Sequence, residues 1–362
     1  MQYRFVSADS HVAEPADLWL NYIDPKFRPK APHLEHQPAT DVFVCEGANT
    51  LPVGLIAGCR RKDHEVRKEG RYDEDIPRGG YDPHARIKEM EQDGLDAEVV
   101  YPTVSMGMFM LEDLEFQKAC FGAYNTWVAD YCNTYPDRIK GIAAVPLEDI
   151  EWAVGELHRT RKLGLPGAMI ARTPDGARPY HDSWYDPFWA AAQELGMPVS
   201  LHVATERRPK QKTLTEIILN PTYIQKVFID MVFSGFFDRF PRVKVLAVES
   251  DVGWAGNTIE RMDWQYTRFR NLRPAGEMTC KRLPSEYFHN NIYYTFLRDA
   301  SGIAIREVVG LENLMWSSDY QHHISTWPHS REIIERQSKG LPPEHERKIF
   351  CDNAVNLYGF KN

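Results

Sequence analysis

Two acids and a histidine follow the first apolar segment of the chain, in the stretch SADSHVAEP at residues 7–15. Asp9, His11 and Glu14 all carry side chains that can bind a metal ion. Asp9 and His11 are two residues apart, so along an extended segment their side chains point the same way and can reach one ion. The stretch therefore predicts either a polar turn at the end of a strand or part of a metal site.

Further imidazole and carboxylate groups stand at the ends of three later apolar segments. His202 lies in VSLHV, Glu249 ends VKVLAVES, and Asp319 ends LMWSSDY. Taken singly, each has an ordinary structural alternative: a core histidine bonded to the backbone, a carboxylate paired with Arg261, or a helix cap. Taken together, they indicate a divalent metal site, provided that the fold brings the segment ends to one place.

Short apolar segments alternate with amphipathic segments, which is typical of parallel strands covered by helices. The expected strands are residues 4–8, 97–101, 139–145, 167–171, 199–203, 243–248, 291–296 and 314–317. The expected helices are residues 85–94, 115–135, 150–163, 185–195, 222–236, 257–268 and 300–309, with two more in 332–358. Eight alternations favour a (β/α)8 barrel over an open doubly wound sheet, which would usually show a Gly-rich phosphate loop. The carboxyl ends of barrel strands form one rim, so the candidate ligands would meet there.

Residues 20–80 do not fit this alternation. They are Pro-rich and charged, with runs such as RRKDHEVRKEGRYDED at 60–75, and are too long for an ordinary barrel loop. We interpret the chain, residues 1–362, as a single barrel domain with 20–80 as an insertion after the first strand. The insertion is either a lid or small subdomain, or a solvated surface excursion.

The composition excludes several classes of protein. The formal net charge of −8 argues against nucleic acid as the main partner. There is no run of about 18 apolar residues that would predict a membrane span, and the first residues lack the apolar region of a signal peptide. The six cysteines are scattered and include no CxxC pair, which indicates reduced thiols. We therefore expect a cytoplasmic enzyme, assembled as a homo-oligomer, that acts on a small molecule.

Three motifs, DSHVAEP, DPFWAAAQELGMPVSLHV and MWSSDYQHHISTWP, resemble the amidohydrolase-related metalloenzymes. The branch most similar to this chain includes aminocarboxymuconate semialdehyde decarboxylase and aromatic acid decarboxylases. The resemblance runs from Ser7 to Trp327, and the family's fold implies a distorted (β/α)8 barrel. The order of the three motifs is specific for the superfamily but not for one reaction.

The resemblance also implies a set of metal ligands. Matched to the family's motifs, Asp9, His11, His202 and Asp319 would hold one divalent ion, either zinc, iron or manganese. Glu14, close to the first pair, is a further candidate for the same ion or a second one. The fourth strand reads GAMIAR and lacks the lysine that bridges two ions in the larger branches of the superfamily.

One departure bears on the reaction. The decarboxylases of this branch usually place a histidine at the end of the sixth strand, where this chain has Glu249. We therefore favour a metal-dependent hydrolase, in which metal-activated water attacks an ester, thioester, amide or lactone carbonyl and Asp319 or Glu249 takes the proton. Glu249 could instead hold a second ion. The alternative function is a metal-dependent, non-oxidative decarboxylase of an aromatic or related carboxylic acid, and a non-enzymatic barrel protein would be expected to have lost a ligand.

Other polar groups expected at the same rim could bind an anionic or acyl substrate. Arg172 ends the fourth strand, Arg298 follows the seventh, and His322 comes three residues after Asp319. A solvated, structural location is the alternative for each of them. Tyr101 and Thr103, at the end of the second strand, could add a wall to the pocket.

Overall fold

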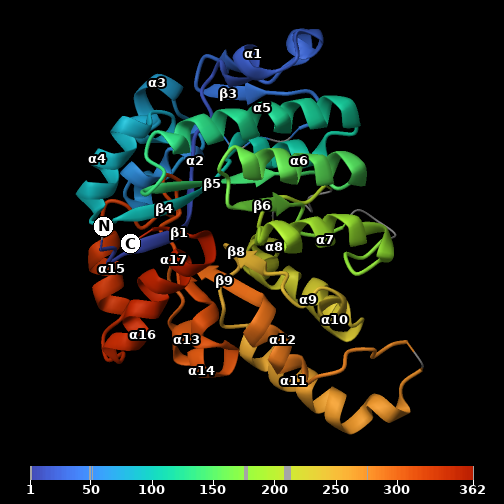
Figure 1. The fold of residues 1–362 in the computed structure, drawn as a ribbon. Coiled ribbons are helices and arrows are strands. Elements are labelled where there is room, and N and C mark those ends of the chain that lie inside the picture. The colour runs from blue at the N-terminus through green and yellow to red at the C-terminus, as the bar shows by residue number, and fades with distance from the viewer. Residues whose placement is uncertain are drawn as a thin grey trace.

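The computed structural model describes residues 2–48, 50, 52–174, 178–207, 213–274 and 276–361. Eight parallel strands lie side by side in chain order: β1 (Val6–His11), β4 (Ala97–Tyr101), β5 (Ile139–Ala144), β6 (Gly167–Ile170), β7 (Val199–His202), β8 (Val245–Val248), β9 (Ile292–Phe296) and β10 (Leu314–Trp316). Helices surround them (Figure 1): α4 (Pro83–Asp93), α5 (Leu114–Asn133), α6 (Ile150–Lys162), α7 (Asp186–Leu195), α9 (Ile224–Phe233), α11 (Ala255–Phe269), α12 (Pro284–Asn291), α13 (Ala300–Ala304) and α14 (Arg306–Val309). The predicted (β/α)8 barrel is confirmed.

The barrel closes where the segment after β10 meets β1. The backbone N–H of Asp319 donates to the carbonyl of Asp9 at 2.9 Å, and the N–H of His11 donates to the carbonyl of Tyr320. Three serine hydroxyls bond one another across the same seam, at 2.9–3.2 Å: Ser7, Ser10 and Ser318. Because the two ends of the strand order meet here, the open doubly wound alternative is wrong.

The predicted strands agree with the observed ones to within a few residues, with one informative exception. We expected the first strand at residues 4–8, with the polar residues after it, but β1 runs from Val6 to His11. All six of its residues are buried, so Asp9 and His11 lie inside the strand and not in a turn beyond it. The sequence LGMPV behaves as expected: α7 ends at Leu195, Gly196 takes a φ of 61°, and β7 begins at Val199.

The described residues of the segment 20–80 form only short elements. These are the end of α1 (Leu18–Tyr22), β2 (His33–His36), β3 (Asp41–Val44), α2 (Val53–Ile56) and α3 (Tyr72–Asp75), joined by 3-10 turns. The strands β2 and β3 form an antiparallel pair that lies beside α5 in Figure 1. Within this segment, the ring of Phe27 packs against that of Phe116 on α5, with the ring centres 5.8 Å apart. The segment is thus packed on the barrel, and its function as a lid stays a prediction.

The C-terminal stretch packs on the barrel beside the N-terminus (Figure 1). It contains α15 (Ser330–Gln337), α16 (Pro343–Arg347) and α17 (Asn353–Tyr358), where we expected two helices; a π-helical turn, Lys348–Asp352, joins the last two. The Tyr358 hydroxyl lies 3.2 Å from that of Tyr101 on β4. The ring of Tyr101 in turn packs 5.1 Å from that of His202, so the C-terminal helix supports the floor of the candidate site.

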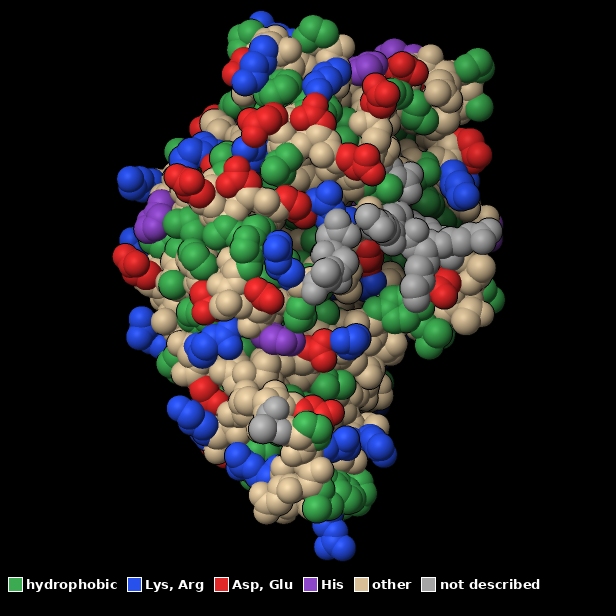
Figure 2. Space-filling model, turned by 90° about the vertical axis from the view of Figure 1, so that its right-hand side faces the viewer, with side chains coloured by type: hydrophobic (Ala, Val, Ile, Leu, Met, Phe, Trp, Pro, Cys, Tyr) green, Lys and Arg blue, Asp and Glu red, His purple; other side chains and the backbone are tan. Residues whose placement is uncertain are grey.

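None of the helices in the described part of the chain is long and apolar enough to cross a membrane. On the face seen in Figure 2, acidic and basic side chains are interspersed over the described surface. The homo-oligomer and the cytoplasmic location stay predictions. Helices that the sequence did not predict include α12 (Pro284–Asn291), which precedes β9, and the short α8 (Leu214–Leu219) and α10 (Phe236–Arg239).

A buried carboxylate at the junction of α4 and α15 gives a prediction about pH. Asp93 is 2% exposed, and its Oδ1 accepts the backbone N–H of Ser330 at 2.8 Å. Burial raises the pKa of Asp93 to about 6, despite the opposing hydrogen bonds from Ser330. The folded protein then binds more protons than the unfolded chain between about pH 4 and 6, so its stability should fall as pH rises through this window.

Replacing Asp93 by Asn should remove this pH dependence. At pH 7, Asp93→Asn is expected to raise the free energy of unfolding by up to about 3 kcal/mol, because the amide oxygen can still accept from Ser330 without a buried charge. Urea unfolding of both proteins from pH 4 to 7 measures the effect. Parallel loss of stability in the two proteins would assign the pH dependence to another group.

Candidate metal centre

A bulge in β1 sets the direction of the first two candidate ligands. Ser7 pairs with Glu98 of β4, whereas Ser10 pairs with Val100, so three steps along β1 oppose two along β4. A bulge re-aims the side chains around it. Asp9 lies in the bulge, and its Oδ1 is 3.5 Å from Nε2 of His11 at the end of the strand.

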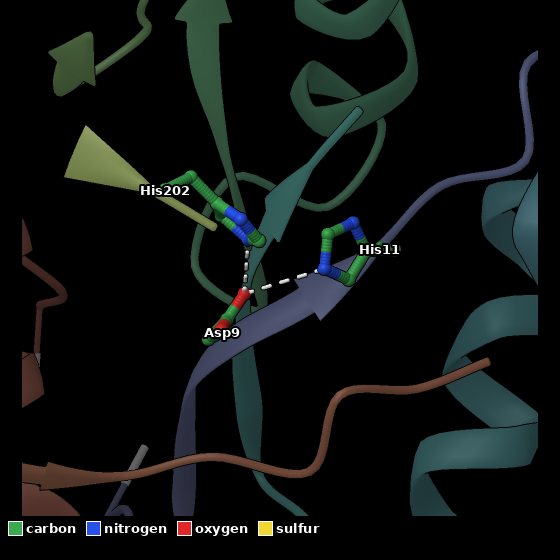
Figure 3. Close-up of side chains that lie close together, drawn as sticks. All are labelled: Asp9, His11 and His202. Atoms are coloured by element: carbon green, nitrogen blue, oxygen red, sulfur yellow. Dashed lines mark ion pairs between the residues drawn. The ribbon is translucent and has the colours of Figure 1, made fainter. Parts of the chain in front are cut away.

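His202 completes a group of three at the end of β7. Its Nε2 lies 3.5 Å from the same Oδ1 of Asp9. Figure 3 shows the carboxylate of Asp9 between the two imidazoles. All three residues are fully buried, and their ligand atoms lie within 4.8 Å of one another, close enough to hold one metal ion.

Asp319 joins this group from the other end of the chain. It follows β10, is fully buried, and its Oδ1 lies 3.1 Å from Nε2 of His11. Its φ of 48° is in the left-handed region, which costs a non-glycine residue on the order of 1–3 kcal/mol. The hydrogen bond from its N–H to Asp9 holds the backbone at this point. The structure thus brings together Asp9, His11, His202 and Asp319.

Each of these four residues has a buried polar atom with no hydrogen-bond partner among the described residues. The four atoms are Asp9 Oδ1, His11 Nε2, His202 Nε2 and Asp319 Oδ2. Unpaired buried polar atoms are costly, and four of them in one place need a common explanation. They are two carboxylate oxygens and two imidazole nitrogens, a donor set that suits zinc, iron or manganese.

The tautomers of the two histidines fit the same explanation. Nδ1 of His11 lies 2.8 Å from the carbonyl of Pro102, and Nδ1 of His202 lies 2.8 Å from that of Val203. A carbonyl can only accept, so Nδ1 carries the hydrogen and a neutral ring presents the lone pair of Nε2 to the cluster. Metal-binding histidines are oriented in this way. A lone pair facing carboxylate oxygens is repulsive unless a cation lies between them.

The charges around the cluster shift several pKa values. Burial, followed by the charge of His322, lowers the pKa of His11. Burial also acts to lower the pKa of His202, but the carboxylate of Asp9 outweighs it and raises that pKa to about 9. Burial opposes ionisation of Asp319, yet His322 and His11 hold its pKa below the ordinary value.

His322 lies against a candidate ligand, whereas the sequence assigned it to substrate binding. Its Nδ1 is 3.0 Å from Oδ1 of Asp319, and with His11 these residues form a second group able to hold a metal ion. Its Nε2 is 3.0 Å from the hydroxyl of Thr103, which donates to the carbonyl of Val12. Both ring nitrogens are therefore engaged by protein groups.

Glu249 lies next to the cluster but outside both groups. It follows β8 with a left-handed φ of 53°, and its Oε2 is 3.8 Å from Nδ1 of His202. Its side chain keeps 20% exposure, whereas the four candidate ligands have none. Burial, and then the charge of Asp319, raise the pKa of Glu249 well above its ordinary value. The neighbouring carboxyl groups Asp319 and Glu249 are thus shifted in opposite directions.

Glu14 is not brought to the cluster. Its two carboxylate oxygens accept the backbone N–H groups of Val104 and Ser105 at 2.8 and 2.9 Å, at the start of the 3-10 helix Val104–Met110. Those N–H groups have no partner within the helix, and a carboxylate is the natural acceptor for them. Glu14 therefore fixes the loop after β4, and spacing from Asp9 in the sequence gave no sign of this.

The two arginines expected at the rim are bonded to protein groups. Arg172 is 1% exposed; its guanidinium donates to the backbone carbonyl and side-chain oxygen of Asn220 and forms an ion pair with Glu206. Arg298 donates to the carbonyls of Ile324 and Ser325, in the loop that follows Asp319. Both shape the rim, and the sequence gave no indication of these partners.

Two threonines at the site were not assigned a polar role by the sequence. Thr103 contacts His322, as described above, although we expected only a pocket wall there. Thr295 on β9 accepts the N–H of Glu249 at 2.9 Å, and its hydroxyl lies 3.5 Å from Oδ2 of Asp9. Only Thr295 could have been predicted from the sequence to lie at the site, because it is a polar residue near the end of the apolar strand NIYYTF.

A family profile described as Amidohydrolase matches residues 34–360, which is most of the chain and includes the barrel strands from β4 to β10 but not β1. The chain belongs to the amidohydrolase family. It is 25% identical over 297 residues to a gamma-resorcylate decarboxylase of Polaromonas sp., covering 75% of this chain and 86% of the relative. The match confirms the prediction, made from the three sequence motifs, that the chain is a member of the amidohydrolase superfamily.

Solved structures share the fold over the whole chain. An amidohydrolase of Mycobacterium avium subsp. paratuberculosis has a TM-score of 0.78 at 22% identity, covering 100% of this chain and 99% of that one. A 5-carboxyvanillate decarboxylase of Novosphingobium aromaticivorans has a TM-score of 0.73 at 20% identity, covering 99% and 97%. That decarboxylase was solved with bound manganese and 3-methoxy-4-hydroxy-5-nitrobenzoic acid.

The comparisons correct the expected reaction. We favoured a hydrolase because Glu249 stands where a histidine was expected, but the relatives that this amidohydrolase matches include decarboxylases of gamma-resorcylate and of 2-amino-3-carboxymuconate-6-semialdehyde. The prediction of an enzyme holds, and the hydrolase hypothesis is wrong. The hydrolase hypothesis relied on one residue, Glu249 at a strand end, although the rest of the barrel is similar to decarboxylases.

The contact of Glu14 with the loop after β4, and not with the metal cluster, can be tested by mutation. Glu14→Gln should leave the metal content unchanged and lower the free energy of unfolding by about 1–3 kcal/mol, because the new amide group faces backbone N–H donors. Elemental analysis and urea unfolding measure the two effects. Loss of bound metal with unchanged stability would instead show that Glu14 is a metal ligand.

Proposed function

We propose that this amidohydrolase is a metal-dependent, non-oxidative decarboxylase of an aromatic or closely related carboxylic acid. The single observation that carries the metal-dependent part is the group of four buried donor atoms without partners. The similarity to decarboxylases of hydroxylated benzoic acids supports the reaction and the substrate class. The substrate is thus a small anionic molecule.

Asp9, His11, His202 and Asp319 would hold one divalent ion. Two carboxylates and two neutral imidazoles balance the charge of such an ion, and manganese, zinc or iron all accept this mixture of oxygen and nitrogen. When bound, the ion would supply positive charge that attracts a substrate carboxylate and withdraws electrons from the substrate. The hydrogen bonds from Nδ1 of each histidine to a carbonyl keep Nε2 directed at it.

Glu249 would supply the proton. It is the carboxyl group next to the cluster that is not used as a ligand, and it is more exposed than the ligands, on the side from which a substrate would arrive. The ring carbon that bears the carboxylate takes the proton from Glu249. The bond from that carbon to the carboxylate then breaks, its electron pair returns to the ring, and carbon dioxide leaves. Glu249 recovers a proton from water.

The other predicted substrate-binding residues would act less directly. His322 holds Oδ1 of Asp319 through its Nδ1, which leaves Oδ2 of Asp319 for the ion. Arg298 adds positive charge to the rim, which favours an anionic substrate. The charge of Arg172 is balanced by Glu206, and the N–H groups of both arginines hold neighbouring loops. The substrate would reach the site between these loops.

Residues 20–80 are proposed to cover one side of the site, within a single domain. The N–H of Cys59 donates to the carbonyl of Gln321 at 3.2 Å, and the N–H of His323 donates to that of Leu55 at 3.1 Å. These bonds join the insertion to the loop that carries Asp319 and His322. A covering segment excludes water, which strengthens electrostatic interactions within the site.

The reaction is tested by release of carbon dioxide. Protein loaded with manganese should release it from hydroxylated benzoic acids such as 2,6-dihydroxybenzoate, and release should stop on removal of the metal by a chelator. His202→Ala should lose metal and activity by more than the roughly 10- to 100-fold that loss of an outer hydrogen-bond partner typically costs. His289→Ala, exposed on α12, is the matched control and should keep both. A metal-loaded protein that hydrolyses esters and releases no carbon dioxide from any such acid would contradict the proposal.

The proton-donor role predicts a second outcome. Glu249→Gln keeps the size of the side chain but has no acidic proton, so turnover should fall on the order of 10² to 10⁴-fold while the metal content stays the same. Asp251→Asn, on the same loop, is the control for loss of a nearby carboxylate. Stopped-flow assays with elemental analysis separate the cases: loss of one metal equivalent would make Glu249 a ligand, and normal turnover would remove it from the mechanism.

A further inference from the structure

Arg86 is a fully buried arginine beneath the rim, outside the residues that the sequence singled out. It lies on α4 and ranks among the largest side chains with no exposure. Its Nε donates to Oε2 of Glu98 on β4 at 2.6 Å, and Glu98 is itself 2% exposed. A buried arginine is costly unless its charge is balanced, and Glu98 provides the balance. The ion pair with Glu98 does not explain the other contacts that Arg86 makes.

The same guanidinium contacts the main chain at the candidate ligands. Its Nη1 donates to the backbone carbonyl of His11 at 2.8 Å and, less closely, to that of Gly79 at 3.3 Å. Its face lies 4.0 Å from the centre of the ring of Tyr320, the residue directly after Asp319. One side chain therefore holds a ligand residue of β1 and the neighbour of a ligand residue from the far end of the chain.

The two points that Arg86 holds are also bonded to each other. The N–H of His11 donates to the carbonyl of Tyr320, and the Tyr320 hydroxyl donates to Glu89, one turn along α4 from Arg86. The separation of His11 from Asp319 is thus fixed from one side by the seam of the barrel and from below by α4. A planar guanidinium with several donors can make these contacts at once, whereas a lysine ammonium cannot match the geometry.

We propose that Arg86 is a positioning residue for the metal site: by binding the carbonyl of His11 and the ring of Tyr320 together, it sets the distance between the donor atoms of His11 and Asp319. The inference rests on the proposed metal site but not on the reaction. Outer contacts that orient ligands typically change metal affinity by about 10- to 100-fold when they are removed. The dissociation constant for the metal is therefore the quantity to measure.

The test replaces the ion pair without leaving a lone buried charge. The double variant Arg86→Met with Glu98→Gln should stay folded, because no unpaired charge is buried, and should raise the dissociation constant for manganese about 10- to 100-fold. Competition with a chelating dye measures that constant without substrate. The control is the double variant Arg159→Met with Glu156→Gln, which removes another ion pair, on α6, with contacts of 2.6 and 2.7 Å. It should lower the melting temperature and leave the dissociation constant within about twofold of the wild type's.

Single variants keep the test decisive if the double variant does not fold. Tyr320→Leu removes the ring under Arg86 but retains the ion pair, and it should weaken manganese binding, whereas Tyr320→Phe keeps the ring and should bind more tightly than the leucine variant. Equal affinities for the wild type and Tyr320→Leu would overturn the positioning role, whatever the reaction is, and so would an unchanged affinity in the folded Arg86 double variant. Metal binding by the wild type without carbon dioxide release would instead reject the proposed function alone, and a wild type that binds no metal would reject both.

Discussion

Two carboxylates that are buried away from solvent determine how the groups at the centre of this barrel are arranged. Asp9 and Asp319 both have no exposure, and both approach Nε2 of His11, at 3.5 and 3.1 Å. Negative charges in a dry interior repel strongly, and desolvation of each is unfavourable. The histidine tautomers add lone pairs to the same space. A divalent cation removes all of these penalties together, and it accounts for the convergence of the four groups on one point.

The remaining structure can be understood as the means of holding these groups from both ends of a long chain. Residues 9 and 319 meet only because eight strands curve until β1 lies beside the segment after β10. Backbone hydrogen bonds, the cluster of serine hydroxyls and Arg86 all act at that seam. Left-handed backbone at Ala204, Glu249 and Asp319 follows three different strands at the same rim. Such conformations persist where the surroundings fix them, and they are common at functional sites.

Much of the architecture followed from the sequence because it depends on patterns that are local. Apolar segments of strand length and amphipathic segments of helix length are visible in a single sequence, and their alternation predicts the barrel. Asp9, His11, His202 and Asp319 could be selected since each ends or follows such a segment. Glu14 could not be assigned correctly, because the donors to its carboxylate are backbone N–H groups of residues 103–105, and only folding brings these together. The bulge in β1 and the contact between Thr103 and His322 are hidden for the same reason.

The reaction was harder to predict than the site, and the reason is chemical. A divalent ion held by carboxylates and imidazoles can position water against a carbonyl, or it can position a carboxylate and withdraw electrons from a ring. The ligand set is the same for both, so it cannot decide between hydrolysis and decarboxylation. The difference lies in where a proton is needed: hydrolysis needs a base beside the ion, and decarboxylation needs an acid beside a carbon. A carboxyl group at the position of Glu249 serves as either, depending on whether it is ionised. Burial and the nearby negative charge of Asp319 raise the pKa of Glu249. A raised pKa suits proton transfer in either direction, so the acid role proposed for Glu249 rests on the similarity of the chain to decarboxylases.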